Sequence, residues 1–157
     1  MAETKNRQIV VRELPKGELT EDHFGLQTVE VAAPGSGQIL VRTILVSLDA
    51  ANRAWMQGAT YRSAIEAGQV MDGLSIGEVV ATGSDRFAVG DIVFASGGWQ
   101  DYALLSEKAA GKLPGDYRPL SHFISLLGIA GKTAYHGLMW IGEPKAGDTV
   151  VVSAAAG

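Results

Sequence analysis

The chain closes with Thr149-Val-Val-Val-Ser-Ala-Ala-Ala-Gly157, which reads as a buried strand that runs into the first glycine of a turn. Its apolar residues do not alternate with polar ones, and such runs are typical of strands covered on both faces of a parallel sheet. In a dinucleotide-binding βαβ unit, the turn continues through another glycine into a helix whose N-terminus binds the pyrophosphate. The stretch therefore predicts the first strand of a nucleotide-binding α/β domain.

Short apolar runs separated by turns precede this stretch. The 20 glycines are spread among these runs and do not gather in a linker, which is typical of an all-β domain. Gln38–Ser47, rich in β-branched residues, is the clearest strand. The runs expected to form strands are Gln8–Leu14, Leu26–Val31, Gln38–Ser47, Ser75–Ala81, Ile92–Ala95 and Trp99–Ser106. We expect a mainly β domain with flanking helices, folded as a small and partly open barrel.

Three segments favour helix. Asp49 can cap a helix over Ala50–Gln57. Ser121–Leu127 and Lys132–Ile141 follow the strands, and the second of these is apolar nearly all round. We expect one domain over residues 1–142 and the start of a second, nucleotide-binding domain over residues 143–157.

The composition excludes several classes of protein and site. The net charge is −4 without a basic cluster, which argues against nucleic-acid and anionic-membrane partners. With no cysteine there is no disulfide, thiolate zinc site or cysteine nucleophile. The polar N-terminus shows no signal peptide, and no apolar run approaches the ~20 residues of a membrane span. We expect a soluble, cytoplasmic protein.

Six segments in order resemble one family. Most of the chain from Gln38 to Gly157 is covered by this resemblance. The segments are Val46-Ser-Leu-Asp-Ala-Ala-Asn-Arg53, Gly77-Glu-Val-Val, Gly90-Asp-Ile-Val-Phe, Gly98-Trp-Gln-Asp-Tyr-Ala103, Gly128-Ile-Ala-Gly-Lys-Thr-Ala-Tyr135 and Lys145-Ala-Gly-Asp followed by the closing stretch. Together they resemble the zinc-independent medium-chain dehydrogenase/reductases, in the branch of prostaglandin, alkenal and curcumin reductases.

The resemblance implies a GroES-like catalytic domain followed by a Rossmann domain, of which this chain holds only the first strand. It also implies an NADP(H)-dependent enzyme that reduces the activated C=C bond of enals and enones. Zinc alcohol dehydrogenases need Cys and His ligands, and here Cys is absent and His23, His122 and His136 are scattered. Hydride addition to a polarised C=C bond needs only hydrogen-bond donors and a proton for the enolate. We therefore expect no metal.

The resemblance also assigns the cofactor contacts. Thr133 corresponds to a threonine near the nicotinamide carboxamide, and Ile129 to a position beside the nicotinamide. The small residues Ala154, Ala156 and Gly157 open the turn that approaches the pyrophosphate. The alternatives are a helix threonine bonded to a carbonyl of the preceding turn and a core isoleucine.

Two residues are expected at the reacting centre. The amide of Asn52 would bind a ribose hydroxyl or the substrate carbonyl, unless it is an exposed polar helix residue. The phenol of Tyr61 would donate to the developing enolate oxygen, unless its ring only packs. Ala51 replaces an aromatic residue of the family, which leaves a roomier pocket or one filled by Trp55. Asp49 and Arg53, four residues apart, are expected to form a salt bridge within the helix.

Two rivals stay open: a zinc-independent quinone oxidoreductase and a non-enzymatic GroES-like binding module. Because the cofactor turn stops at Gly157, we expect the polypeptide 1–157 to be inactive alone. If its last strand stays extended, an apolar face and an unpaired edge favour pairing between copies of the chain.

Overall fold

The structure is a computed structural model that describes residues 5–59, 63–116 and 118–153. Contacts divide the chain into two compact units, Met1–Arg118 and Pro119–Gly157, and each unit is described by itself. The boundary expected between residues 142 and 143 separates a catalytic from a nucleotide-binding domain, whereas these units reflect contacts alone, so that boundary stays a prediction.

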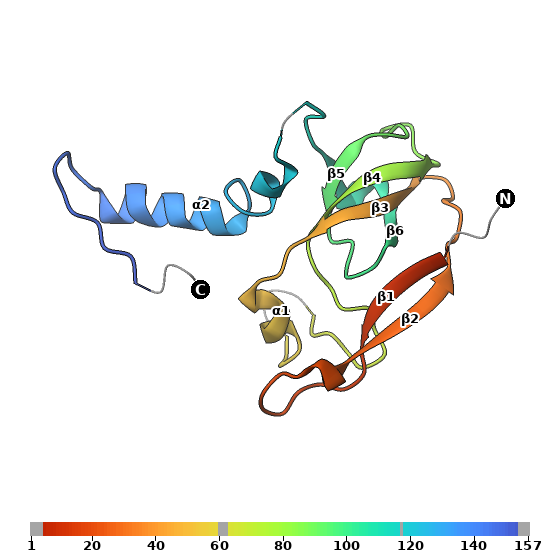
Figure 1. The fold of residues 1–157 in the computed structure, drawn as a ribbon. Coiled ribbons are helices and arrows are strands. Elements are labelled where there is room, and N and C mark those ends of the chain that lie inside the picture. The colour runs from red at the N-terminus through yellow and green to blue at the C-terminus, as the bar shows by residue number, and fades with distance from the viewer. Residues whose placement is uncertain (1–4, 60–62, 117, 154–157) are drawn as a thin grey trace. The chain divides into compact units, whose positions relative to one another are not determined.

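A five-stranded antiparallel sheet dominates the first unit, with the strands in the order β6-β3-β4-β5-β7 (Figure 1). The strand β3 pairs with both β4 and β6, and its register against β4 shifts twice. Such shifts bend a sheet, and this one curls into a half-barrel. Its strands are β3 (Gln38–Val46), β4 (Ser75–Thr82), β5 (Ile92–Ala95), β6 (Tyr102–Ser106) and β7 (Ala110–Lys112).

A two-stranded antiparallel ribbon lies beside this sheet in the same unit. It consists of β1 (Lys5–Val11) and β2 (Phe24–Glu30), with a 3-10 turn at Glu21–His23 before β2. Isolated bridges join Gln8 to Gln100 and Val10 to Val70, so β1 is tied to the segments before β6 and β4. The expected fold class, mainly β with flanking helices, is confirmed.

Two apolar clusters stabilise the first unit. One lies inside the curled sheet, where alternate residues of the strands point inward. The other lies between the ribbon, the helix α1 (Ala50–Trp55) and the loop before β4, with Trp99 against it. Trp55 belongs to this second core and is 4% exposed. The clusters are Ile39, Val41, Val79, Phe87 and Val93, and Val11, Trp55, Met56, Ile65 and Met71.

The start of α1 is fixed as expected, but its salt bridge is not. Asp49 is the N-cap, and its Oδ1 accepts a hydrogen bond from the backbone N–H of Ala51 at 2.8 Å. The predicted Asp49–Arg53 pair is wrong, because the Asp49 carboxylate turns toward the helix N–H groups. Arg53 instead donates from Nη2 to the carbonyl of Gly17 at 2.8 Å.

The second unit is helical. A 3-10 turn (Leu120–Phe123) stands where a longer helix over Ser121–Leu127 was expected. The helix α2 (Ile129–His136) begins three residues before the expected start, and one turn of π-helix (Gly137–Gly142) continues it. Neither helix contains a buried residue. Within the described residues, no helix has the length and apolarity needed to cross a membrane.

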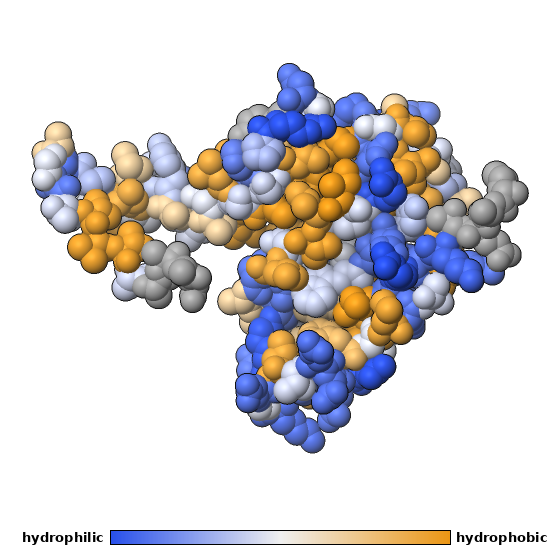
Figure 2. All heavy atoms as spheres, in the orientation of Figure 1, coloured by the Kyte–Doolittle hydropathy of each residue, from blue (hydrophilic) through white to orange (hydrophobic). Residues whose placement is uncertain are grey.

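The segment Thr149–Val152 differs from its prediction as a buried strand. In the described part of the chain it belongs to no strand, and Val151 is 86% exposed. A strand requires a partner for its N–H and C=O groups and a layer on each covered face, and the structure gives this segment neither. Figure 2 shows apolar surface over this unit, where Ile141 is 84% exposed.

Candidate active site

A polar cavity of about 360 Å³ lies in the first unit, between the loop that follows α1 and the turn before β6. Hydroxyl, amide and carboxyl side chains make up much of its lining, together with the backbone of two glycines. Its residues are Ser63, Ala64, Ile65, Gln69, Val70, Asp72, Ser96, Gly97, Gly98 and Gln100.

The two glycines form a wall without side chains. Gly98 has a φ of 71°, a conformation that favours glycine. A Cβ added to Gly97 would collide with the hydroxyl of Ser75. The turn is held by hydrogen bonds from Gly98 N to Gly73 O (3.1 Å) and from Trp99 N to Met71 O (2.8 Å).

Asn52 adjoins this cavity through Asp72. Its Oδ1 accepts from Asp49 N at 2.8 Å, and its Nδ2 donates to Asp72 O at 2.9 Å. The side chain therefore joins the start of α1 to a residue of the cavity wall. Asn52 is 7% exposed, so the alternative of an exposed helix residue is wrong. Its expected contact with cofactor or substrate stays a prediction.

Tyr61 lies outside the described residues. The next described residues, Ser63, Ala64 and Ile65, line the polar cavity. The described residues 63–65 thus border the cavity whose wall Asn52 contacts through Asp72.

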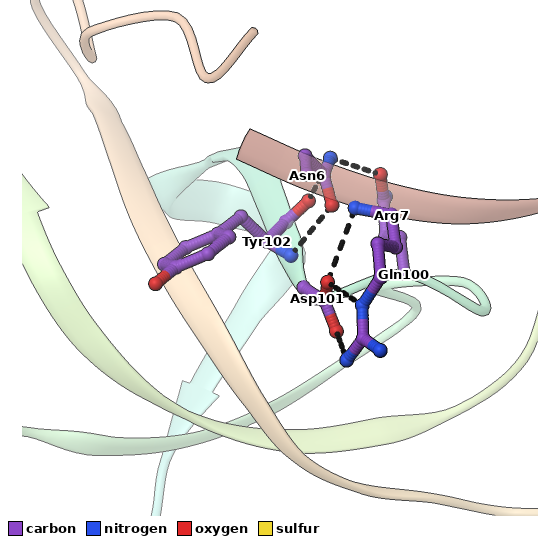
Figure 3. Close-up of polar contacts among 5 residues, drawn as sticks. All are labelled: Asn6, Arg7, Gln100, Asp101 and Tyr102. Atoms are coloured by element: carbon purple, nitrogen blue, oxygen red, sulfur yellow. Dashed lines mark hydrogen bonds and ion pairs between the residues drawn. The ribbon is translucent and has the colours of Figure 1, made fainter. Parts of the chain in front are cut away.

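A second cavity in the same unit, of about 500 Å³, is mostly apolar and shares Gln100 with the first. At its edge Arg7 and Asp101 form a bidentate ion pair, with Nε–Oδ2 and Nη2–Oδ1 distances of 2.8 and 3.0 Å (Figure 3). This hydrogen-bonded guanidinium lowers the pKa of the Asp101 carboxyl, against the opposing effect of burial.

Ile129 and Thr133 lie together in the second unit. They are four residues apart on α2, hence on one face of the helix, and line a cavity of about 520 Å³ with His136, Trp140 and Ile141. Within the described chain, no hydrogen-bond partner of the Thr133 hydroxyl is found, so the alternative of a bond to the preceding turn is not observed. The remaining expected contacts, Ala154, Ala156 and Gly157, lie outside the described residues.

Several residues of the polar cavity were not singled out from the sequence. Ser96 precedes the Gly97–Gly98 pair, Gln100 follows the pair after one tryptophan, and Asp72 precedes β4. A pair of glycines close to polar residues was the available signal. Nothing local indicated that this turn meets the loop after α1. Among the described residues, no group of three His, Asp or Glu side chains is placed to hold a metal ion.

The chain matches a protein family described as the N-terminal domain of oxidoreductase, over residues 7–113. It is 38% identical to the NADPH-dependent curcumin reductase of Escherichia coli over 98% of the chain and 45% of that relative. It is 29% identical to the NADP⁺-dependent 2-alkenal reductase of Nicotiana tabacum over 99% of the chain and 47% of that relative. The chain thus spans a little under half the length of the curated relatives it matches.

Among solved structures, the fold is similar to CurA from Vibrio vulnificus in complex with NADPH. The TM-score is 0.84 and the identity 36%, over 96% of this chain and 45% of that one. The same residues that fold as the curled sheet and its ribbon are therefore those of an oxidoreductase domain.

Proposed function

The chain belongs to the zinc-independent medium-chain dehydrogenase/reductases, through its N-terminal oxidoreductase domain, and on this ground we propose that the whole protein reduces activated C=C bonds of enals and enones with NADPH. The observation that carries the proposal is the polar cavity. The loop after Tyr61 and the Asp72 backbone held by Asn52 both border it. A GroES-like module used only for binding would also hold a ligand in such a cavity, so NADPH turnover by the full-length protein decides between the two functions.

The proposal assigns two residues of α2 to the nicotinamide end of the cofactor. Ile129 is 66% exposed and would offer apolar surface to a ring, and the Thr133 hydroxyl, which lines the same cavity, would hydrogen-bond a carboxamide. When bound, NADPH would supply a hydride to the β carbon of the substrate. Thr133 and Ile129 would orient the ring, and Ala154, Ala156 and Gly157 would admit the pyrophosphate.

The polar cavity would hold the enal or enone. Hydroxyls of Ser63 and Ser96 at its lining can donate to a carbonyl oxygen, where negative charge develops during the reaction. The phenol of Tyr61 is the proposed hydrogen-bond donor to the developing enolate oxygen, and the α carbon would take its proton from solvent. Asn52 would fix the cavity wall through its hydrogen bond to Asp72. The second N–H of its amide would bind a ribose hydroxyl or the substrate carbonyl. No step of this scheme requires a metal.

The test is NADPH oxidation by the purified full-length protein with methyl vinyl ketone, menadione or acetone as substrate. We expect turnover of the enone, little of the saturated ketone, and no loss after treatment with EDTA. Turnover of menadione alone would favour the quinone oxidoreductase, and loss of enone turnover on chelation would contradict the metal-free scheme.

Thr133 can be tested by matched substitutions. Thr133→Val keeps the shape and removes the hydroxyl, so the KM for NADPH should rise about 2- to 12-fold, the equivalent of one hydrogen bond. Thr133→Ser keeps the hydroxyl and should stay near wild type. An unchanged KM in Thr133→Val would remove Thr133 from the cofactor site.

The isolated polypeptide 1–157 should show no reductase activity, because its cofactor turn would have only its opening residues. NADPH oxidation by this polypeptide with methyl vinyl ketone would contradict that expectation. Pairing between copies of the chain and a cytoplasmic location also remain proposals.

A further inference from the structure

Three glutamine side chains form a continuous hydrogen-bonded series in the first unit. Gln27 Nε2 donates to Gln8 Oε1 at 2.8 Å, and Gln8 Nε2 donates to Gln100 Oε1 at 2.6 Å. Gln100 Nε2 then donates to the carbonyl of Gly97 at 2.7 Å. The series runs from β2 through β1 to the glycine wall of the polar cavity.

The amide of Gln100 has one orientation that satisfies its neighbours. Its Oε1 accepts from Gln8 and also from Asn6 Nδ2, at 3.0 Å (Figure 3). Asn6 is 6% exposed and is itself fixed by both backbone groups of Tyr102, at 2.8 and 2.9 Å. A reversed Gln100 amide would turn its N–H groups toward two donors and its oxygen toward the Gly97 carbonyl. The Nε2 of Gln100 is therefore directed at Gly97.

A hydrogen bond to the Gly97 carbonyl can hold the glycine wall of the polar cavity in place. Gly97 and Gly98 have no side chains through which packing could hold this part of the wall. The backbone N–H groups of Gly98 and Trp99 hydrogen-bond to the segment before β4, and the side-chain amide of Gln100 hydrogen-bonds to the Gly97 carbonyl. Gln100 also lines the cavity itself.

We propose that Gln100 is a positioning residue of this active site: its bond to Gly97 O sets the glycine wall against which the enone lies. The inference rests on the proposed function and deepens it. Gln8, Asn6 and Gln27 act through Gln100, by keeping its amide in the orientation that donates.

Gln100→Glu isolates this single bond. Glutamate keeps the length of the side chain and an oxygen that accepts from Gln8 and Asn6, but it places a second oxygen opposite the Gly97 carbonyl. With the carboxylate ionised, we expect the KM for methyl vinyl ketone to rise about ten-fold in the full-length protein, with the KM for NADPH unchanged. When the carboxyl is protonated, its O–H can donate to Gly97, so the increase relative to wild type should shrink as pH falls.

Gln100→Leu removes both ends of the interaction and should raise the same KM at every pH. Arg7→Leu is the matched control, because it removes the neighbouring ion pair with Asp101 and none of the amide bonds. Its KM for the enone should stay within about two-fold of wild type. An unchanged enone KM in Gln100→Glu, or a defect that pH does not alter, would overturn the proposal.

Backbone hydrogen exchange separates this proposal from the proposed function. If the wild-type protein reduces no enone, the proposed function fails, yet exchange at Gly98 and Trp99 still reports the wall. Peptides covering these residues should exchange faster in Gln100→Glu than in wild type at neutral pH, and this difference between the two proteins should shrink in acid. Equal exchange in both proteins would exclude the positioning role whatever the activity.

Discussion

The bidentate pair of Arg7 and Asp101 joins β1 to the segment before β6. Its geometry is the one in which guanidinium and carboxylate interact most strongly, but the Arg7 side chain is 69% exposed. Water and salt therefore screen the pair, and its effect on stability should be small. The lowered pKa of Asp101 nevertheless determines whether this contribution to stability grows or shrinks as pH changes.

Asp101→Asn tests this residue. Because Arg7 lowers the folded-state pKa of Asp101 below the unfolded value of about 3.9, the pair stabilises the fold above that value. This stabilisation is lost as pH falls through the folded-state pKa. The urea midpoint of Asp101→Asn should thus lie slightly below wild type at neutral pH and converge with it in acid.

In both wild type and Asp101→Asn, Lys112 lowers the pKa of Asp91, so the two proteins share this part of the dependence of stability on pH. Only the difference between their urea midpoints therefore reports the Arg7–Asp101 pair. Arg7→Leu should lose the same part of the pH dependence as Asp101→Asn. A midpoint gap that persists in acid would mean that the introduced amide disturbs the packing and that the ion pair contributes little.

At the scale of elements, the N-cap Asp49 fixes the start of α1, the helix whose Asn52 contacts the wall of the polar cavity. Asp49→Ala removes the acceptor for Ala51 N and should lower the free energy of unfolding by about 1 kcal/mol. Asp49→Ser keeps a capping oxygen and should recover most of this loss. Chemical denaturation measures both, and equal stability of Asp49→Ala and wild type would show that the cap contributes nothing.

Local signals made part of this fold predictable. β-branched residues marked β3 within one residue, and Asp49 marked the start of α1, because both effects depend on near neighbours in the chain. The partner of Arg53 was not predictable, since Gly17 lies far away in sequence. The segment Thr149–Val152 has a strand composition, but forming a strand also needs neighbours that the described residues do not give it.

The candidate site divides in the same way. Thr133 and Ile129 share a face of α2 and line one cavity, but the sequence predicted a helix only from Lys132, so their common face became apparent only with the observed start of α2 at Ile129. The role of Gln100 depends on pairing between β1 and the segment before β6, across more than ninety residues of sequence. Composition and residue spacing do not indicate which residues of two distant segments pair, so this contact could not be predicted.

At the scale of the whole molecule, apolar side chains are unevenly buried. Ile39 in the sheet is fully buried at 0% exposure, whereas Ile141 in the π-helical turn is 84% exposed. An isolated helix of this length is marginal in water, and stability normally comes from packing of its apolar face. The sheet of the first unit should therefore carry most of the stability of the polypeptide 1–157.

The same substitution at two isoleucines tests this distribution. Ile39→Ala leaves a cavity in the core and should cost about 2–5 kcal/mol, whereas Ile141→Ala should stay within about 0.5 kcal/mol of wild type. Urea unfolding of the polypeptide 1–157 measures both. A large loss for Ile141→Ala would mean that its side chain is covered in solution. Sedimentation would then decide the cause, because a dimer that dissociates in Ile141→Ala identifies a second copy as the cover, and a monomer places the contact within one chain.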